Sequence, residues 1–327
     1  MAGRFPEPAP SHLFHWKEGT WVEDGNAKAM FAKLGAVTDA LWADLNGDGA
    51  KELVVACDWG AIRVFEWKGG ALGERSKDWG LSEMVGRWQS VGAGDFNKDG
   101  KVDLVAGNWG LSSMYNQAPD QQAEIYFGDY NEAGRVEMME AYRAADGKVL
   151  PWRDMTGFEQ SMPWIAQTFA THKNYAGATV REILGARKQK GGAVRTKTLA
   201  STLFLNRGTK FEAMPLPREA QFTPVFGVVV ADFDNDGFQD IALAQNFFGT
   251  RENDGPMDAG RGLILRGLAG GKMTPMSAVE SGIAAYGEHR GIAASDFDKD
   301  GKIDLAIGQN GAKTKLFVNQ GDANQTR

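Results

Sequence analysis

The amino-acid sequence predicts an all-β repeat protein, and three observations support this fold class. A nine-residue acidic pattern occurs four times, each copy is followed by a short apolar run, and 42 of the 327 residues are glycine. The four copies span residues 44–52, 95–103, 232–240 and 296–304. Short apolar runs bounded by Gly and Asn are typical of buried strands. We therefore expect a strand–loop–strand unit repeated along the chain.

Each acidic pattern carries side-chain oxygens at its positions 1, 3, 5 and 9 and glycine at position 6. This donor set suits Ca²⁺, and the backbone carbonyl of position 7 can add a ligand. The expected ligands are Asp44, Asn46, Asp48, Ala50 and Glu52; Asp95, Asn97, Asp99, Lys101 and Asp103; Asp232, Asp234, Asp236, Phe238 and Asp240; and Asp296, Asp298, Asp300, Lys302 and Asp304. The sequence thus predicts about four structural Ca²⁺ ions, because an all-oxygen site does not favour zinc or copper.

Counting acidic ligands gives an expected order of affinity among the four loops. The first two loops have three acidic ligands and an Asn, whereas the last two have four acidic ligands. Because ligand charge raises the affinity of a site for calcium, we expect the first two loops to bind more weakly.

The residues after each loop exclude two other calcium-binding families. An EF-hand needs a bidentate Glu at position 12 and helices on both sides. Position 12 is Val55, Ala106, Leu243 or Ile307. Dockerin-type repeats continue as a helix, whereas strand-like apolar runs follow these loops, and similar runs at 91–94, 228–231 and 292–295 precede the last three.

With strands on both sides of the loops, the chain resembles the FG-GAP, or VCBS, repeats of integrin α-subunit propellers and of many bacterial surface proteins. The resemblance covers most of residues 30–320. Segments 37–42, 107–111 and 175–179 are similar to bacterial VCBS-repeat proteins related to cartilage acidic protein, although the ASPIC/UnbV segment of those proteins is absent. The resemblance implies one calcium-binding β-propeller over residues 1–327, with about five to seven blades.

A fifth, degenerate copy of the acidic pattern lies at residues 129–137. Ala133 replaces the carboxylate of position 5. A loop without one of its four side-chain oxygens loses affinity for the ion, so we expect a blade that holds no calcium.

The two ends of the chain leave the closure of the ring open. Residues 13–23 parallel residues 203–212, and both segments look like the outer two strands of a blade. The last repeat ends at Asn319 with no fourth strand after it. Either the two ends complete one blade together or the chain is a piece of a longer protein. No apolar stretch is long enough to cross a membrane, and the N-terminus lacks a signal peptide.

Residues 153–186 interrupt the strand pattern and predict a short helical insertion, either a lid or partner-docking element or a helical pair packed on the propeller rim. The basic run that follows is either a polyanion site or a solvated loop. It consists of Arg187, Lys188, Lys190, Arg195 and Lys197.

The turns after the second strand of each unit should emerge on the face opposite the calcium loops. Asn or Asp beside aromatic rings could bind a glycan or a protein ligand there. The alternative is that the rings wedge between blades and the polar side chains cap the turns. These residues are Asp58, Trp59, Asn108, Trp109, Asn246, Phe247, Phe248 and Asn310.

The sequence contains no recognised catalytic motif. His12, His15, His172 and His289 lack metal-binding spacing, and Cys57, the single cysteine, can form no intrachain disulfide. The net charge of −6 does not favour nucleic-acid binding. Extracellular calcium modules bind with a Kd of about 10⁻⁴ to 10⁻³ M, which predicts an extracytoplasmic location.

We therefore expect an adhesion or ligand-binding module that is a monomer or part of a larger chain, and the resemblance suggests a bacterial source. The alternative is a carbohydrate-active lyase, dehydratase or hydrolase. For such an enzyme Glu288, His289, Asp58 and the basic run are the candidate residues.

Overall fold

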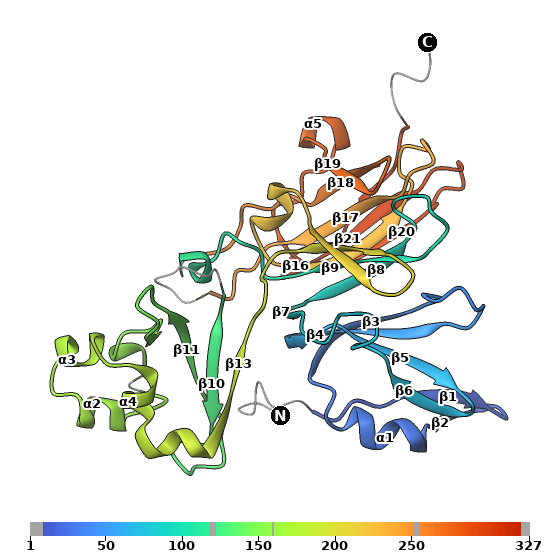
Figure 1. The fold of residues 1–327 in the computed structure, drawn as a ribbon. Helices are drawn as coiled ribbons and strands as arrows, with labels where there is room; N and C mark the ends of the chain where they lie inside the picture. The colour runs from blue at the N-terminus through green and yellow to red at the C-terminus, as the bar shows by residue number, and fades with distance from the viewer. Residues whose placement is uncertain (1–8, 118–121, 159, 251–254, 322–327) are drawn as a thin grey trace.

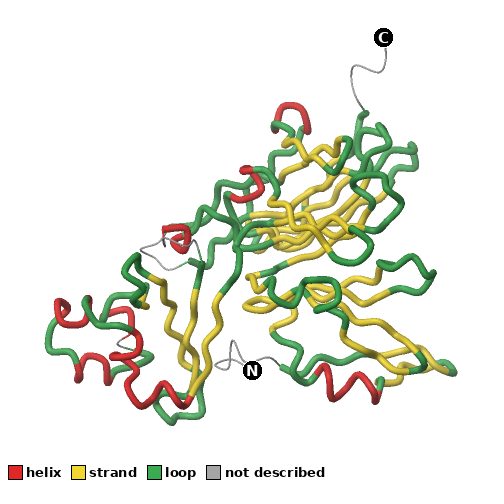
Figure 2. The backbone as a smooth tube through the Cα atoms, viewed as in Figure 1, coloured by secondary structure: helices red, strands yellow, loops and turns green. Residues whose placement is uncertain are grey.

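The computed structural model describes residues 9–117, 122–158, 160–250 and 255–321, and it is mostly β-sheet with a few short helices (Figures 1 and 2). The strands of these residues form six separate antiparallel sheets. The all-β fold class is confirmed. None of the described helices is long and apolar enough to cross a membrane.

Four of the sheets, here called the repeat sheets, each contain one acidic loop between their first two strands. The first has β3 (Ala36–Ala43), β4 (Glu52–Ala61), β5 (Arg63–Lys68) and β6 (Ala71–Glu74), with β7 (Val85–Arg87) paired to the end of β4; the second has β8 (Ser90–Gly94), β9 (Asp103–Gly107), β14 (Thr202–Asn206) and β15 (Phe211–Pro215); the third has β16 (Val225–Ala231), β17 (Asp240–Gln245), β18 (Leu263–Leu268) and β19 (Lys272–Pro275); the fourth has β20 (Glu288–Ser295), β21 (Asp304–Asn310) and β22 (Lys315–Phe317). Strands therefore enter and leave every loop as expected.

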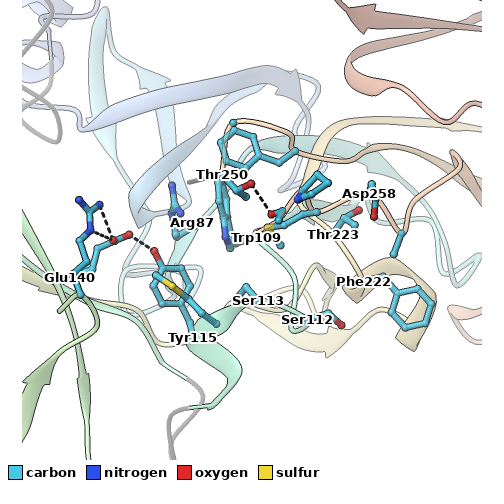
Figure 3. A pocket seen from close by; sticks show the side chains of 18 residues that line it. Arg87, Trp109, Ser112, Ser113, Tyr115, Glu140, Phe222, Thr223, Thr250 and Asp258 are labelled. Atoms are coloured by element: carbon cyan, nitrogen blue, oxygen red, sulfur yellow. Dashed lines mark hydrogen bonds and ion pairs between the residues drawn. The ribbon is translucent and has the colours of Figure 1, made fainter. Parts of the chain in front are cut away.

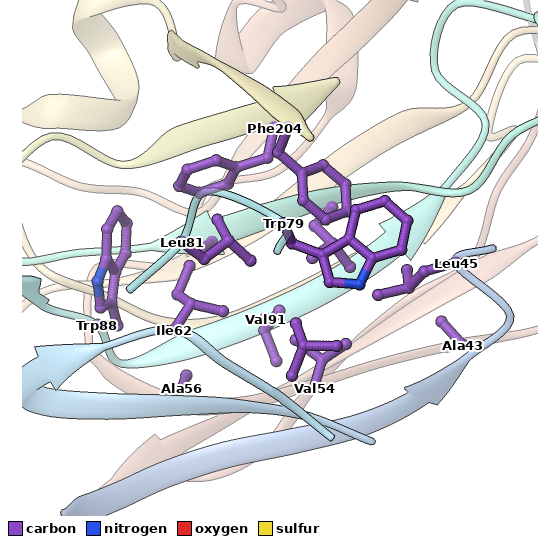
Figure 4. Close-up of a cluster of buried hydrophobic side chains, with 14 residues drawn as sticks. Ala43, Leu45, Val54, Ala56, Ile62, Trp79, Leu81, Trp88, Val91 and Phe204 are labelled. Atoms are coloured by element: carbon purple, nitrogen blue, oxygen red, sulfur yellow. The ribbon is translucent and has the colours of Figure 1, made fainter. Parts of the chain in front are cut away.

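The repeat sheets stack face to face, so the second strands of the first three sheets, β4, β9 and β17, each contribute to two layers of core. On β9, Leu104 packs with Trp88 and Phe204 against the first sheet (Figure 4). The next residue, Val105, faces the third sheet and packs with Leu243. Side chains alternate between the two faces of a strand, and both faces of these three strands are covered, so the positions directly after the initial carboxylate are apolar. This explains the unbroken apolar runs in the sequence.

In the described part of the chain the four repeat sheets are arranged in a row, and the structure shows no closed ring. The first strands β3, β8, β16 and β20 contact one another in this order. The outer face of the first sheet is covered by α1 (Gly25–Phe31), whose Phe31 packs edge-on against Phe65 at 5.4 Å between ring centroids.

The two ends of the chain do not complete one blade in this structure. β1 (Phe14–Lys17) and β2 (Thr20–Glu23) form their own two-stranded sheet beside the first repeat sheet, and the fourth repeat sheet has three described strands. Figure 1 shows the hairpin and the C-terminal end on opposite sides of the row. Of the two possibilities that the sequence leaves open, this structure does not show the one in which the two ends pair.

The degenerate copy lies in a sheet outside the row, which differs from the blade that we expected. This inserted sheet connects the second and third strands of the second repeat sheet and stands to one side of it (Figure 1). Its strands are β10 (Glu124–Gly128), β11 (Glu137–Arg143), β12 (Val149–Pro151) and β13 (Gly191–Arg195).

Short helices follow β12 and precede β13, where the sequence predicted a helical insertion. They are η2 (Thr156–Phe158), α2 (Trp164–Thr168), α3 (His172–Ala176), α4 (Val180–Leu184) and η3 (Gly185–Lys190). Their apolar faces, with Trp164 and Leu184, share a core with Tyr126 and Met139 of the inserted sheet. The remaining short helices are η1 (Met114–Gln117), η4 (Arg218–Gln221) and α5 (Ala278–Ser281).

Candidate metal centres and ligand face

The four acidic loops share one backbone conformation, which the sequence pattern explains. Position 6 is glycine in every loop and has a positive φ, between 82° and 87°. Glycine adopts such φ values without steric cost. Position 4, which is Gly47, Lys98, Asn235 or Lys299, is also left-handed, with φ between 57° and 76°. Two left-handed residues fold the loop back so that its side-chain oxygens gather on one side.

Backbone N–H groups fix the carboxylates at both ends of each loop. At position 1, Asp44 accepts a hydrogen bond from the N–H of Gly49 at 2.9 Å, and its three counterparts accept the same bond at 2.8–3.0 Å. At position 9, Glu52 accepts from the N–H of Leu45 at 2.7 Å, and its counterparts at 2.8–3.0 Å. The side chains are therefore oriented before any ion binds.

Position 5 is held in the same way in all four loops. Asp48 accepts from the N–H of Ala50 at 2.8 Å, and the equivalent carboxylates accept from position 7 at 2.7–2.9 Å. One oxygen of each carboxylate takes part in this bond. The other oxygen accepts from a side chain within the loop in three of the four cases, from Asn46 to Asp48, from Asn97 and Lys101 to Asp99, and from Lys302 to Asp300.

Carboxylates come close together in the first, third and fourth loops. Oxygens of Asp232, Asp234 and Asp240 lie within 4.8 Å of one another, and so do those of Asp296, Asp298 and Asp300. The first loop brings together Asp48, Glu52 and Glu66, the last of which comes from β5. Crowded carboxylates repel one another unless a cation binds. The residues present therefore fit a hard divalent cation such as Ca²⁺.

Burial of the position-9 carboxylates strengthens this argument. It raises the pKa of Asp103 and of Asp240 to about 6, and it raises the pKa of Glu52. A buried carboxylate without a counter-charge costs free energy, which a bound cation would remove.

The degenerate loop has the same kind of backbone-to-carboxylate hydrogen bonds as the intact loops, but it lacks the side-chain ligand of position 5. Asp129 accepts hydrogen bonds from Ala133 and Gly134, both at 2.8 Å, and Glu137 accepts one from Tyr130 at 2.8 Å. Ala133 supplies no oxygen. Asn131 donates to Glu137 at 3.1 Å, as Asn46 donates to Glu52 in the first loop at the same distance.

On the opposite face, the polar residues of the expected ligand site are mostly occupied by the protein. Asn108 is fully buried, accepts from the backbone of Arg87 and donates to Thr198 and Ala200. Asn246 is also fully buried and donates to the carbonyls of Gly260 and Gly287 at 2.8 and 2.9 Å. These two amides cap turns, so they are not displayed as we expected.

The aromatic residues of this face stack with two arginines across neighbouring sheets. The Arg87 guanidinium lies 3.6 Å from the Trp109 ring centroid and 5.0 Å from that of Trp59. Trp109 packs on Phe247 at 5.2 Å. Arg290 lies 5.5 Å from the ring of Phe247. The rings thus wedge between sheets, and of the expected aromatic residues Phe248 is 44% exposed.

The charged residues of this face are paired. Asp58 binds Arg87 with both carboxylate oxygens at 3.0 Å. Glu288 pairs with Arg290 at 2.6 Å and accepts from the amide of Asn310 at 2.7 Å. His289 is fully buried, and burial lowers its pKa, so its ring is neutral. These contacts give Asp58, Glu288 and His289 structural roles, and the structure does not bring them together as a catalytic group.

A pocket of about 640 Å³ nevertheless opens beside the stacked rings, between the repeat sheets and the inserted sheet (Figure 3). Glu140 on its wall accepts a hydrogen bond from Tyr115 at 2.5 Å and from Arg153 at 3.0 Å. The hydroxyl of Ser113 is buried and has no hydrogen-bond partner among the described residues. Other lining residues are Ser112, Thr223, Thr250, Met257 and Asp258. No motif in the sequence pointed to Ser113 or Glu140, because both belong to the insertion.

The basic run lies against aromatic rings of the inserted sheet and helices. Arg187 stacks over Trp164 at 4.3 Å, Lys188 lies 5.3 Å from the ring of Tyr126, and Lys190 pairs with Glu132. These side chains therefore have partners within the chain.

Comparison with known proteins gives a family match for part of the chain. Residues 44–106, which contain the first two acidic loops and the strands between them, match the family model described as FG-GAP-like repeat. This segment is an FG-GAP-like repeat. Because the third and fourth loops have the same hydrogen bonds as the first two, they have the same local structure as the FG-GAP-like repeat.

Similarity to other proteins is low. A search of curated proteins found no match. Solved structures with some likeness include the Bacillus licheniformis rhamnogalacturonan lyase PL11, at 14% identity and a TM-score of 0.35, with 88% of this chain and 44% of the lyase covered. The V. cholerae biofilm matrix protein Bap1 has 13% identity and a TM-score of 0.33, with 96% and 62% covered. The chain thus covers less than two thirds of either protein, and likeness at this level carries no argument about function.

Proposed function

We propose that this chain is a calcium-stabilised module of the β-propeller type that binds a ligand outside the cytoplasm. The observation that carries this proposal is the shared frame of the four acidic loops, in which backbone N–H groups aim carboxylates at one point. Bound calcium would add positive charge among these crowded carboxylates. The chain's own contribution is to hold Asp44, Asp48 and Glu52, or their counterparts, in position.

Bound ions would fasten the first two strands of each repeat sheet together. Position 1 follows the first strand, and position 9 begins the second, as Asp103 does at the start of β9. A ligand shared by both strands resists their separation. The affinity expected of such loops, with a Kd of about 10⁻⁴ to 10⁻³ M, would fill them only where calcium is abundant, which supports an extracytoplasmic location.

The pocket beside the stacked rings is the proposed ligand site, and its chemistry favours a glycan over a protein surface. It is concave and combines hydroxyl groups with carboxylates, and Ser113 offers a buried hydroxyl with no partner in the described part of the chain. Sugars present many hydroxyl groups that can pair with such side chains.

The test is binding to an immobilised glycan panel with and without chelator. Ser113→Ala and Asp258→Asn should each weaken binding while leaving the melting temperature unchanged, and Ser281→Ala, outside the pocket, serves as the matched control. Binding that the two pocket variants leave intact would contradict this site. Conversion of a bound polysaccharide to product would favour the enzyme alternative, with Glu140 and Tyr115 on the pocket wall as the residues to substitute next.

A further inference from the structure

The third strand of each repeat sheet places a different residue beside its acidic loop. The residue that follows position 9 pairs with Phe65, Phe204, Leu265 or Phe317, in the four sheets in order. The register is therefore the same in all four. The next residue along the third strand is Glu66, Leu205, Arg266 or Val318. At this equivalent position the first sheet has a carboxylate, the third sheet has a guanidinium, and the second and fourth sheets have apolar residues.

In the first loop this position adds negative charge. An oxygen of Glu66 lies within 4.8 Å of oxygens of Asp48 and Glu52. Arg75 also binds Glu66, at 2.8 Å, and lies 3.6 Å from Asp78. Because Arg75 is shared with Asp78, it balances the carboxylate of Glu66 only in part. Glu66 was not among the ligands that we expected from the loop sequence.

In the third loop this position adds positive charge. Nε of Arg266 lies 2.7 Å from Oδ2 of Asp234, the ligand expected at position 3. A second cation approaches from the neighbouring sheet, where Lys98 lies 3.8 Å from the ring of Phe238 at position 7. Basic side chains of the protein therefore already balance part of the negative charge of the third loop.

We propose that the third-strand residue sets the order of calcium affinity, so that the first loop, with Glu66, binds Ca²⁺ more tightly than the third loop, with Arg266. This inference rests on the proposed calcium function. It reverses the order that counting acidic ligands predicts for these two loops. Arg266 repels the incoming ion and holds an oxygen of Asp234, whereas Glu66 attracts the ion and can supply a further oxygen.

The decisive variant is Arg266→Leu, which copies the residue found at the equivalent position of the second sheet. A unit charge at side-chain distance from a divalent ion changes its binding constant by about tenfold in water-like surroundings. Arg266→Leu should therefore raise the calcium affinity of one site about tenfold. Glu66→Gln should lower the affinity of another site by a similar factor. Bound calcium is counted by mass spectrometry at a series of buffered free calcium concentrations.

Two controls keep the result interpretable. Adding Asp232→Asn to Arg266→Leu disables the third loop and should remove the gain, which assigns it to that loop. Arg266→Gln keeps a polar side chain, removes the charge and should reproduce the gain if charge is the cause. Circular dichroism checks that each variant is folded.

The outcomes separate this inference from the proposed function. The inference is supported if wild-type protein binds about four ions and if both Arg266→Leu and Arg266→Gln raise the calcium affinity of one site. Four bound ions with no change or weaker binding in both variants would overturn it and leave the calcium function standing. Wild-type protein that binds no calcium would overturn both.

Discussion

The guanidinium of Arg87 lies 3.6 Å from the ring centroid of Trp109, and Asp58 holds it there through two hydrogen bonds of 3.0 Å. Arg87 and Asp58 belong to the first repeat sheet, and Trp109 follows the second strand of the next sheet. Both charged side chains are 11% exposed. This contact joins neighbouring sheets on the face opposite the acidic loops.

Removing Arg87 should destabilise the protein strongly. Arg87→Met leaves Asp58 as a mostly buried carboxylate without its partner, and breaking such a pair costs about 2 to 4 kcal/mol. Unfolding in urea measures the loss. The double variant Asp58→Asn with Arg87→Met should lose less than Arg87→Met alone, because no unpaired charge remains. A single-variant loss below about 0.5 kcal/mol would show that the pair does not join the sheets.

The buried amide of Asn206 should be a second stabilising contact between sheets. It donates to the carbonyl of Leu45 in the first loop at 2.8 Å and to that of Val102 in the second at 3.0 Å. Asn206→Ala leaves both carbonyls without this donor, so we expect a loss of about 1 to 3 kcal/mol. The exposed Gln320→Ala is the control and should change the free energy of unfolding little. Equal effects of the two variants would contradict this role.

Restoring the missing ligand should create a calcium site in the degenerate loop. Asp129 and Glu137 are already held as in the intact loops, so Ala133→Asp supplies the absent carboxylate at position 5. We expect one more bound calcium per chain at millimolar free calcium, counted on the purified protein. Ala133→Ser, which adds no charge, should leave the number unchanged. An unchanged count in Ala133→Asp would contradict the view that the degenerate loop lacks only the ligand of position 5.

Cys57 should be inert in the folded protein. It is 1% exposed, and burial raises the pKa of its thiol to about 11. Since the thiolate is the reactive form, labelling by a thiol reagent at pH 8 should be at least about 100-fold slower than in urea. Rapid labelling of native protein would show that the first sheet opens readily.

The loops and their flanking strands could be predicted from sequence because both are local. Spacing of oxygen ligands, glycine at position 6 and the apolar run after it all lie within about fifteen residues, the range in which pattern arguments work best. Long-range pairing could not be predicted in the same way. β9 pairs with β14 across the whole inserted sheet, and although the pattern marks residues 153–186 as an insertion, it does not show that the strands before them also leave the repeat sheet.

The hydrogen bonds of the ligand face also depend on residues distant in the sequence, which a local pattern does not identify. Asn108 and Asn246 follow their strands as expected, yet the inserted residues 198–200 and the turn at Gly260 supply the carbonyls that bind their amides. The pairing of Glu66 and Arg266 with the acidic loops also depends on the register of the third strand, which the local pattern does not contain. Which charged side chains lie next to an acidic loop can therefore be seen only in the folded structure.

Calcium-dependent stability tests the central claim most directly. Melting temperature is recorded in chelator and across a calcium titration, and metal is counted on the same samples. Because an ion that binds only the native state must stabilise it, we expect a large rise in melting temperature with about four ions bound. An unchanged melting temperature with no bound metal would contradict the account of the acidic loops and, with it, the proposed extracytoplasmic function.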